Sequence, residues 1–281
     1  MTMQTGTINR DGYALCFQIE GEGIPALVIG SSYFYPKTFS ENLRKTFQFT
    51  FLDHRGFAKT DSETICELKD IVDDIEYCRK KLQLGQITII GHSGHGYMAL
   101  EYAKSYPDSV NRVILIGMGT NHSAEGHQAA EQAFADSVCP NRKKHLQKKL
   151  EKLPQELSEH PEKKFITFCL SNGARSWYDY TYDATFLWEN VHTNNAVIDH
   201  LWGEVFRDID VTKDLEKLDK PVFLALGRYD YLVSPPHMWN SIRHKFQDIT
   251  LRIFERSGHT PQLEEPELFD QELIHWLEHK K

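Results

Sequence analysis

A serine, an aspartate and a histidine of the chain each follow an apolar run. Ser93 lies in GHSGHG after the run ITII, Asp230 follows PVFLALG, and His259 follows ITLRIFE. A serine hydroxyl is a poor nucleophile at neutral pH, so it needs a base to take its proton and an acid to orient that base. Because parallel strands end at one edge of a sheet, this order predicts nucleophile, acid and base in one cleft.

The glycines beside Ser93 suit a sharp turn from a strand into a helix. Such a turn lifts the serine out of the sheet and brings strand and helix backbones close together, so Gly91 and Gly94 fit the neighbouring positions. The N–H of Gly94 begins a helix and would point at a developing oxyanion. The loop IGSSYFYP can supply a second backbone donor from Ser31 or Ser32. We expect Gly94 and Ser31 to form the oxyanion hole.

Each member of the triad also has an ordinary structural interpretation. Asp230 alone could cap a turn, and His259 alone could be a loop histidine. Their coincidence with Ser93 at matching strand ends favours the triad. The loop MGTNHS after RVILIG has no carboxylate, which leaves Asp230 as the acid. His92 and His95 have no accompanying cysteine or carboxylate, so we expect neither a metal site nor a cofactor.

The segments around these residues alternate between strand and helix patterns. Asp11-Gly12 predicts a hairpin turn. Buried strands are expected at 26–30, 49–54, 87–93, 112–117, 221–227 and 249–255, and helices at 67–84, from 95 to about 107, at 235–246 and at 266–280. We expect Gly85 to end the first helix, and Leu268, Phe269, Leu273, Trp276 and Leu277 to face inward from the last. This alternation predicts an α/β fold with a mostly parallel sheet and helices on both faces.

The middle of the chain breaks the alternation. Residues 121–209 are polar and show no clear strand, so we expect a helical cap inserted into a core domain of 1–120 and 210–281. The run NRKKHLQKKLEKL has its leucines on one helical face, which predicts a solvated helix with an apolar stripe.

The cap also holds the aromatic stretch SWYDYTYDATFLW, which has two interpretations. Its rings can pack against each other or can form the wall of a substrate pocket. On the second interpretation the substrate-binding residues are Trp177, Tyr178, Tyr180 and Trp188, joined by Ser32 and Tyr33 from the oxyanion loop.

The composition limits the class of protein to which the chain can belong. The 281 residues are 40% hydrophobic and 26% charged, as is usual for a globular protein, and the net charge of -8 argues against nucleic-acid binding. The start MTMQTGTINRDG has no apolar stretch and no run is long enough to span a bilayer, so we expect neither a secretory signal nor a membrane segment. The five cysteines are odd in number and lack C-x-x-C spacing, which predicts reduced thiols and a cytoplasmic protein. The oligomeric state stays open.

Four stretches resemble the α/β-hydrolase family with a helical cap: GHSGHGYMALEYAKSYPDSVNRVILIG, FLDHRGFAKTD, GRYDYLVSP and SGHTPQLEEPELF. The resemblance implies Ser93 as nucleophile, Asp230 as acid and His259 as base. DHRG and GRYD are closest to the proline iminopeptidase-like branch. Two features depart from the family pattern: His95 replaces a small residue, and IGSSYFYP replaces the usual His-Gly and Gly-Pro-Gly.

These observations predict a cofactor-independent serine hydrolase that acts on a small ester or amide through an acyl-enzyme on Ser93. One alternative is an aminopeptidase like the proline iminopeptidases, which needs cap carboxylates to bind a free α-amino group; the candidates are Asp183, Glu189, Asp199 and Glu204. Another is a ligand receptor that keeps the triad without turnover, because a fold does not fix a function.

Overall fold

The protein, a computed structural model described here for residues 3–61 and 66–280, contains a nine-stranded sheet within that part of the chain. Its strands are β1 Gln4–Arg10, β2 Tyr13–Gly21, β3 Ile24–Gly30, β4 Phe47–Asp53, β5 Lys59–Thr60, β6 Ile87–His92, β7 Val110–Ile116, β8 Val222–Gly227 and β9 Ile249–Phe254. Their spatial order is β1-β2-β4-β3-β6-β7-β8-β9, and the short β5 pairs with β2.

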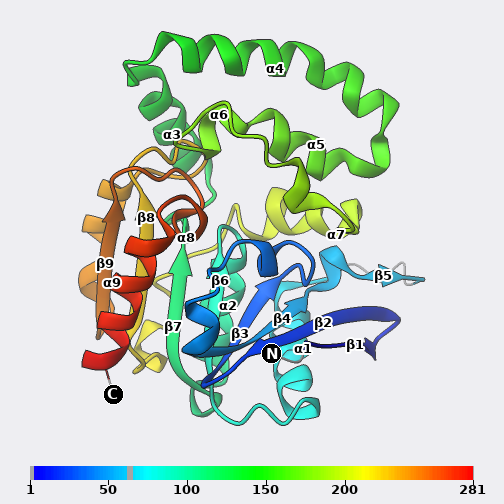
Figure 1. Ribbon diagram of the computed structural model, residues 1–281, viewed down its shortest axis with the longest axis vertical. Coiled ribbons are helices and arrows are strands. Elements are labelled where there is room, and N and C mark those ends of the chain that lie inside the picture. The colour runs from blue at the N-terminus through cyan, green and yellow to red at the C-terminus, as the bar shows by residue number, and fades with distance from the viewer. Residues whose placement is uncertain (1–2, 62–65, 281) are drawn as a thin grey trace.

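The first part of the sheet is antiparallel and the rest is parallel. β1 and β2 form the expected hairpin, because Asp11 and Gly12 both take the positive φ angles of a tight two-residue turn. β2 runs antiparallel to β4, whereas β4, β3, β6, β7, β8 and β9 are parallel neighbours. The carboxyl ends of β7, β8 and β9 therefore lie at one edge, which points upward in Figure 1.

Helices cover both faces of this sheet. The α-helices of the described residues are α1 Leu68–Lys81, α2 His95–Ser105, α3 Ala124–Asp136, α4 Pro140–Glu159, α5 Lys164–Ser171, α6 Gly173–Ser176, α7 Asn195–His200, α8 Pro261–Glu264 and α9 Pro266–His279. Of these, α1 and α2 lie on one face of the sheet and α9 lies on the other. Successive residues of β6 point to opposite faces, so Ile89 packs with α1 and α2 while Ile90 packs with α9. The two hydrophobic cores fix β6 and the turn that follows it.

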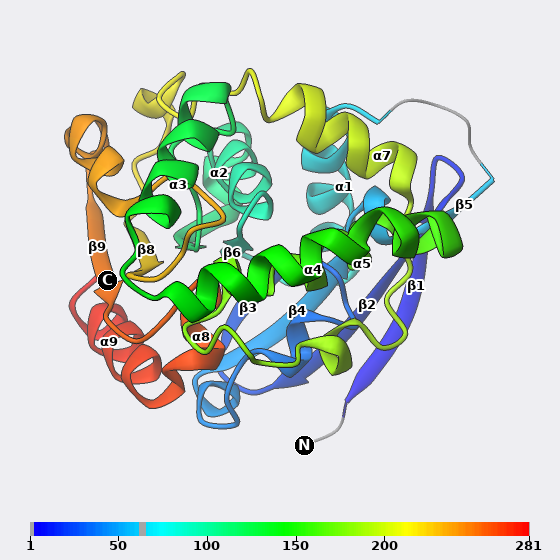
Figure 2. The same ribbon diagram turned by 90° about the horizontal axis from the view of Figure 1, so that it is seen from above.

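The elements between β7 and β8 are helical, and every residue of this stretch is described. Figure 1 shows α3, α4, α5 and α6 above the carboxyl edge of the sheet, and Figure 2 shows α4 crossing over the strands. We propose residues 121–209 as the cap domain of this fold. Within the described residues, no helix is long and apolar enough to cross a membrane.

Four expectations about local structure are wrong in part. Residues 235–246 form two short 3-10 helices instead of an α-helix, and the buried Trp239, whose indole N–H donates to the carbonyl of Met118 at 3.1 Å, fixes the local backbone. Leu268 is exposed on α9. The first helix ends at Lys81, several residues before Gly85. In the basic run of α4, predicted to be solvated, Arg142 is buried.

Candidate active site

Ser93 occupies a strained turn between β6 and α2. Its φ angle is 58°, in the left-handed region that non-glycine residues rarely adopt, and its N–H donates to the carbonyl of Ile116 at 2.8 Å. A side chain on Gly91 would collide with the carbonyl oxygen of His95, which explains the small residue before the turn. The turn leaves the Ser93 side chain partly exposed while its neighbours are buried.

Asp230 and His259 form a buried pair beyond the ends of β8 and β9. His259 Nδ1 lies 2.7 Å from Asp230 Oδ2, and both residues are buried. The carboxylate fixes the proton on Nδ1 and leaves Nε2 free to accept one. The other oxygen of Asp230 accepts the N–H of Leu232 at 3.0 Å, so the carboxylate also stabilises a turn. Ser93 and His259 are not directly hydrogen-bonded, as is common in sites without substrate.

The two candidate oxyanion donors of the loop after β3 differ in their surroundings. Ser31 and Ser32 are both buried. The N–H of Ser32 donates to Asp53 Oδ1 at 2.6 Å, and burial raises the pKa of this carboxyl to about 7 against the opposing effect of that bond. Since Ser32 is engaged, the geometry favours Ser31 as the donor. Tyr33, expected at the substrate, is largely exposed.

A hydrogen-bonded chain of three histidines and a tyrosine lies behind the turn. His54 Nε2 is 3.1 Å from His95 Nε2, His95 Nδ1 is 2.8 Å from Tyr35 Oη, and Tyr35 Oη is 3.2 Å from His92 Nδ1. The last link joins His92 Nε2 to the carbonyl oxygen of His259 at 2.8 Å. His95, which departs from the family pattern, is thus one link of this chain.

The partners at the two ends of the chain determine every proton position. His54 Nδ1 accepts the N–H of Gly56, so its proton is on Nε2 and is donated to His95. His95 therefore carries its proton on Nδ1 and donates to Tyr35, which donates in turn to His92. His92 Nε2–H donates to the His259 carbonyl. All three imidazoles are neutral, because burial lowers the pKa of His54 and His92 to about 3 and that of His95 well below its usual value.

These low pKa values predict a loss of stability in acid. Below about pH 6.5 the unfolded chain binds protons at the three positions while the folded protein does not, until the pH approaches the pKa of about 3 of His54 and His92. In this range, each histidine lowers the free energy of unfolding by about 1.4 kcal/mol for every unit by which the pH falls. Denaturant unfolding of the wild type between pH 6 and pH 4 measures the net slope, to which the buried Asp53, with its pKa raised to about 7, contributes in the opposite sense. We expect His54→Gln to reduce it by about one histidine's share.

The exposed His237 provides the matched control for this measurement. His237→Gln should leave the slope unchanged. An equal slope in His54→Gln and the wild type would show that His54 is not kept neutral by folding.

An aromatic group from the cap lies against the turn. Trp202, in the π-helix Leu201–Val205, touches Gly94 so closely that a Cβ there would lie 2.7 Å from its ring. Its indole contacts Phe165 at a centroid distance of 5.7 Å, and Phe165 contacts Trp188 at 5.8 Å. Phe34 closes the group at 4.7 Å from Trp188. Trp188 was predicted from the sequence, whereas Trp202, Phe165 and Phe34, which lie outside the aromatic stretch, were not.

The remaining aromatic candidates lie elsewhere. Trp177 is buried against Tyr182, and Tyr178 is exposed beside Tyr229. Tyr180 stacks near the guanidinium of Arg142. The structure therefore brings Trp188 toward the turn and leaves Trp177, Tyr178 and Tyr180 in contacts with other parts of the protein.

The loop that carries Trp188 is fastened to the core through its backbone. Lys37 Nζ donates to the carbonyl oxygens of Phe186, Leu187 and Glu189 at 2.8, 3.2 and 3.1 Å. One cation thus holds a turn of the cap through three backbone acceptors.

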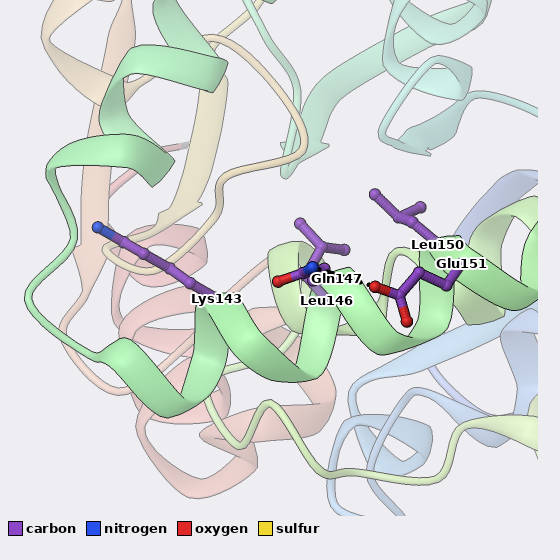
Figure 3. A pocket seen from close by; sticks show the side chains of 5 residues that line it. All are labelled: Lys143, Leu146, Gln147, Leu150 and Glu151. Atoms are coloured by element: carbon purple, nitrogen blue, oxygen red, sulfur yellow. Dashed lines mark hydrogen bonds between the residues drawn. The ribbon is translucent and has the colours of Figure 1, made fainter.

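Two surface grooves lie away from the triad residues. One, of about 450 Å³, is lined by α4 alone, and Figure 3 shows Leu146 and Leu150 pointing to the same side of that helix. The other, of about 260 Å³, lies between the segments at Thr120 and Ile209. Neither includes Ser93, Asp230 or His259 in its lining.

The sheet order, the turn at Ser93 and the acid–base pair together define an α/β-hydrolase architecture. The model of the alpha/beta hydrolase fold family matches residues 22–266. The chain therefore belongs to this family.

Similar proteins agree with this assignment. The AB hydrolase superfamily protein YclE of Bacillus subtilis (strain 168) is 43% identical over 98% of this chain and 99% of its own length. The proline iminopeptidase PfmaB of Pestalotiopsis fici is 25% identical over 86% and 85%. The structure of the esterase EaEST from Exiguobacterium antarcticum has a TM-score of 0.69 at 18% identity, covering 95% and 97%, and supports the fold. Membership in the α/β-hydrolase family and the activities named for these similar proteins support a hydrolase.

Proposed function

We propose that the protein is a serine hydrolase that cleaves small esters with apolar acyl groups through an acyl-enzyme on Ser93. The observation that carries this proposal is the strained turn of Ser93 beside the His259–Asp230 pair at one edge of the sheet. A residue held at positive φ without glycine implies a requirement for its side chain. A histidine oriented by a buried carboxylate is the base that such a serine requires.

The reaction follows from these positions. His259 Nε2 takes the proton of Ser93 as Oγ attacks the carbonyl carbon, and the N–H groups of Gly94 and Ser31 stabilise the oxyanion. The C–O bond then breaks, and the alcohol leaves with the proton from His259. Water, deprotonated by His259, attacks the acyl carbon; the bond to Ser93 Oγ then breaks, His259 returns the proton to that oxygen, and the acid is released. Asp230 stabilises the imidazolium in both steps.

The cap carboxylates give the aminopeptidase alternative little support. Asp183, Glu189, Asp199 and Glu204 are all exposed. Asp199 pairs with Lys164 and Glu204 with His200, while Asp183 accepts from Thr185. A free α-amino group would need a carboxylate directed at Ser93, so an ester is the better substrate.

Competition against a fluorophosphonate probe tests this proposal. A panel of short and long acyl esters and of aminoacyl arylamides, including the prolyl compound, is offered to the wild-type protein, and hydrolysis and protection of Ser93 are both measured. Turnover of the esters is expected. Preference for the prolyl arylamide would support the aminopeptidase, and probe labelling without turnover of any compound would support a receptor.

The aromatic group predicts how the cap selects the acyl chain. Trp202 is partly exposed, lies against Gly94, and its indole N–H has no hydrogen-bond partner among the described residues. Contact between such a ring and an acyl chain is worth about 1–3 kcal/mol. We expect Trp202→Ala to lower kcat/KM by about 5- to 150-fold, more for a bulky acyl ester than for a short one. Trp202→Phe keeps the ring and separates the effect of the N–H.

Tyr178→Ala serves as the matched control, since Tyr178 is an exposed aromatic of the same cap. Its ratio of kcat/KM between the two esters should equal that of the wild type. A ratio that is also constant in Trp202→Ala and Trp188→Ala, with only the Tm lowered, would mean that these rings hold the cap together and do not contact the substrate.

A further inference from the structure

Five consecutive carbonyl groups of the cap, those of Ala174 to Tyr178, all accept hydrogen bonds: two from the loops of Asp230 and His259, and three from a side chain of the cap. We call this stretch the 174–178 segment. The carbonyl of Arg175 accepts the N–H of Tyr231, next to Asp230, at 2.9 Å. The carbonyl of Ser176 accepts the N–H of His259 itself. A side chain on Gly258 would collide with Ser176, so the two backbones are in direct contact.

The other three carbonyls are held by one side chain, Arg142 of α4. Its Nη1 donates to Ala174 and Trp177, both at 2.7 Å, and its Nη2 donates to Tyr178 at 2.6 Å. These carbonyls lie at and just beyond the carboxyl end of α6, where helical carbonyls lack partners and a cation is favourable. The planar fork of a guanidinium matches several acceptors in fixed directions.

Arg142 is buried, and the nearby carboxylate of Asp179 has its pKa lowered, chiefly by hydrogen bonds from Thr181 and in part by the charge of Arg142. The rings of Tyr180, Tyr229 and Tyr231 surround its guanidinium at 5.4, 5.8 and 5.7 Å. A buried charge is expensive to desolvate, and the carbonyl oxygens and aromatic faces that contact this guanidinium belong to the cap or to the loop of Asp230. The contacts of Arg142 thus fix the position of the 174–178 segment relative to the loop of Asp230.

Glu264 of α8 ties the same segment to the loop of His259 from the side of the core. One oxygen accepts the N–H of Tyr178 at 2.7 Å, and the other accepts those of Gly258 and Thr260 at 3.0 and 3.1 Å. The residues on both sides of His259 are therefore linked to the cap through a single carboxylate.

We propose that Arg142 is a positioning residue for the catalytic pair, acting through the 174–178 segment on the backbones of His259 and Tyr231. This inference rests on the proposed function and adds a role for the cap beyond the choice of substrate. Without the guanidinium, three carbonyls lose their partners, and the two carbonyls between them are no longer held where the N–H groups of His259 and Tyr231 meet them. The His259 ring then samples positions away from Ser93.

The test compares Arg142→Met with Lys144→Met, which removes the same charge from an exposed position of the same helix. The rate constant for labelling of Ser93 by a small fluorophosphonate, and kcat and KM for a short ester, are measured for both. A displacement of about 1 Å at a catalytic group costs on the order of 100-fold in rate. For Arg142→Met we expect a loss of this size in both the labelling rate and kcat, while KM stays within about threefold of the wild-type value. Lys144→Met should behave like the wild type. Arg142→Lys should recover part of the lost rate.

Hydrogen exchange of the His259 and Tyr231 amides provides a readout that does not depend on activity. Both amides should lose protection in Arg142→Met. If the wild type is not labelled at Ser93, the proposed function fails, and amide protection still tests the link. Lost protection with full activity would overturn the positioning role, and so would labelling of Arg142→Met within twofold of Lys144→Met.

Should Arg142→Met not fold, Arg142→Lys and Glu264→Gln replace it, since each weakens one side of the 174–178 segment. At least a several-fold fall in the labelling rate is expected in both variants. Wild-type rates in both would overturn the inference.

Discussion

Ser93→Ala is expected to lose at least roughly 10⁴-fold in kcat for any ester that the wild type hydrolyses, and to form no fluorophosphonate adduct. The hydroxyl is the atom that becomes covalently bound, so no neighbouring group can replace it. The loss should not come from unfolding, because the backbone bond from residue 93 to Ile116 and the packing of β6 do not involve the side-chain oxygen. Intact-mass analysis after labelling, with steady-state kinetics, measures both effects.

Ser105→Ala is the control, since Ser105 is an exposed serine at the end of the helix that follows the turn. It should label and turn over like the wild type. His259→Ala should match Ser93→Ala, and the double variant should lose little more, because the two residues act as one unit. An adduct that persists in Ser93→Ala would place the nucleophile elsewhere.

Asp230→Asn is expected to lower kcat by about 10⁴-fold while the protein stays folded. The amide oxygen can still accept the N–H of Leu232, which preserves the turn. The amide nitrogen, however, would face His259 Nδ1 and favour the tautomer with its proton on Nε2, which cannot accept the proton of Ser93. Kinetics with a short ester and a thermal melt measure the two outcomes separately.

The exposed Asp208, paired with Arg207, offers the matched aspartate. Asp208→Asn should retain the kcat of the wild type. Near wild-type activity in Asp230→Asn would mean that another carboxylate orients His259, and equal losses in both variants would point to net charge rather than to the acid.

The strands and the helices of the core were predictable because the spacing of their apolar residues indicates which side chains are buried. Ile89 and Ile90 face different cores, and the continuous apolar run ITII is typical of a parallel strand that is buried on both faces. The positive φ angles at Asp11 and Gly12 follow from residues that tolerate them. Residues 235–246 were predicted as an α-helix but form two short 3-10 helices, because a tertiary contact, the bond from the buried Trp239 to the carbonyl of Met118, decides the local structure.

The parts of the site that the sequence did not reveal depend on contacts between distant residues. Nothing near Arg142 distinguishes it from the lysines that follow it in the same basic run, because the three carbonyls that it binds lie more than thirty positions away. His95 was recognised as unusual, but its partners His54 and Tyr35 come from two other loops. Trp202 lies in a segment with no motif, and only the fold brings it to Gly94.

The bonds from Lys37 to the Phe186–Glu189 turn have a consequence for the divergence of such enzymes. All three acceptors are main-chain oxygens, which every amino acid possesses, so the attachment survives a change of residue at each of these positions. Trp188 can therefore be exchanged for a smaller or more polar residue while the turn stays in place. Selection, or a saturation library at this position, can explore new acyl preferences without first having to rebuild the support of the cap.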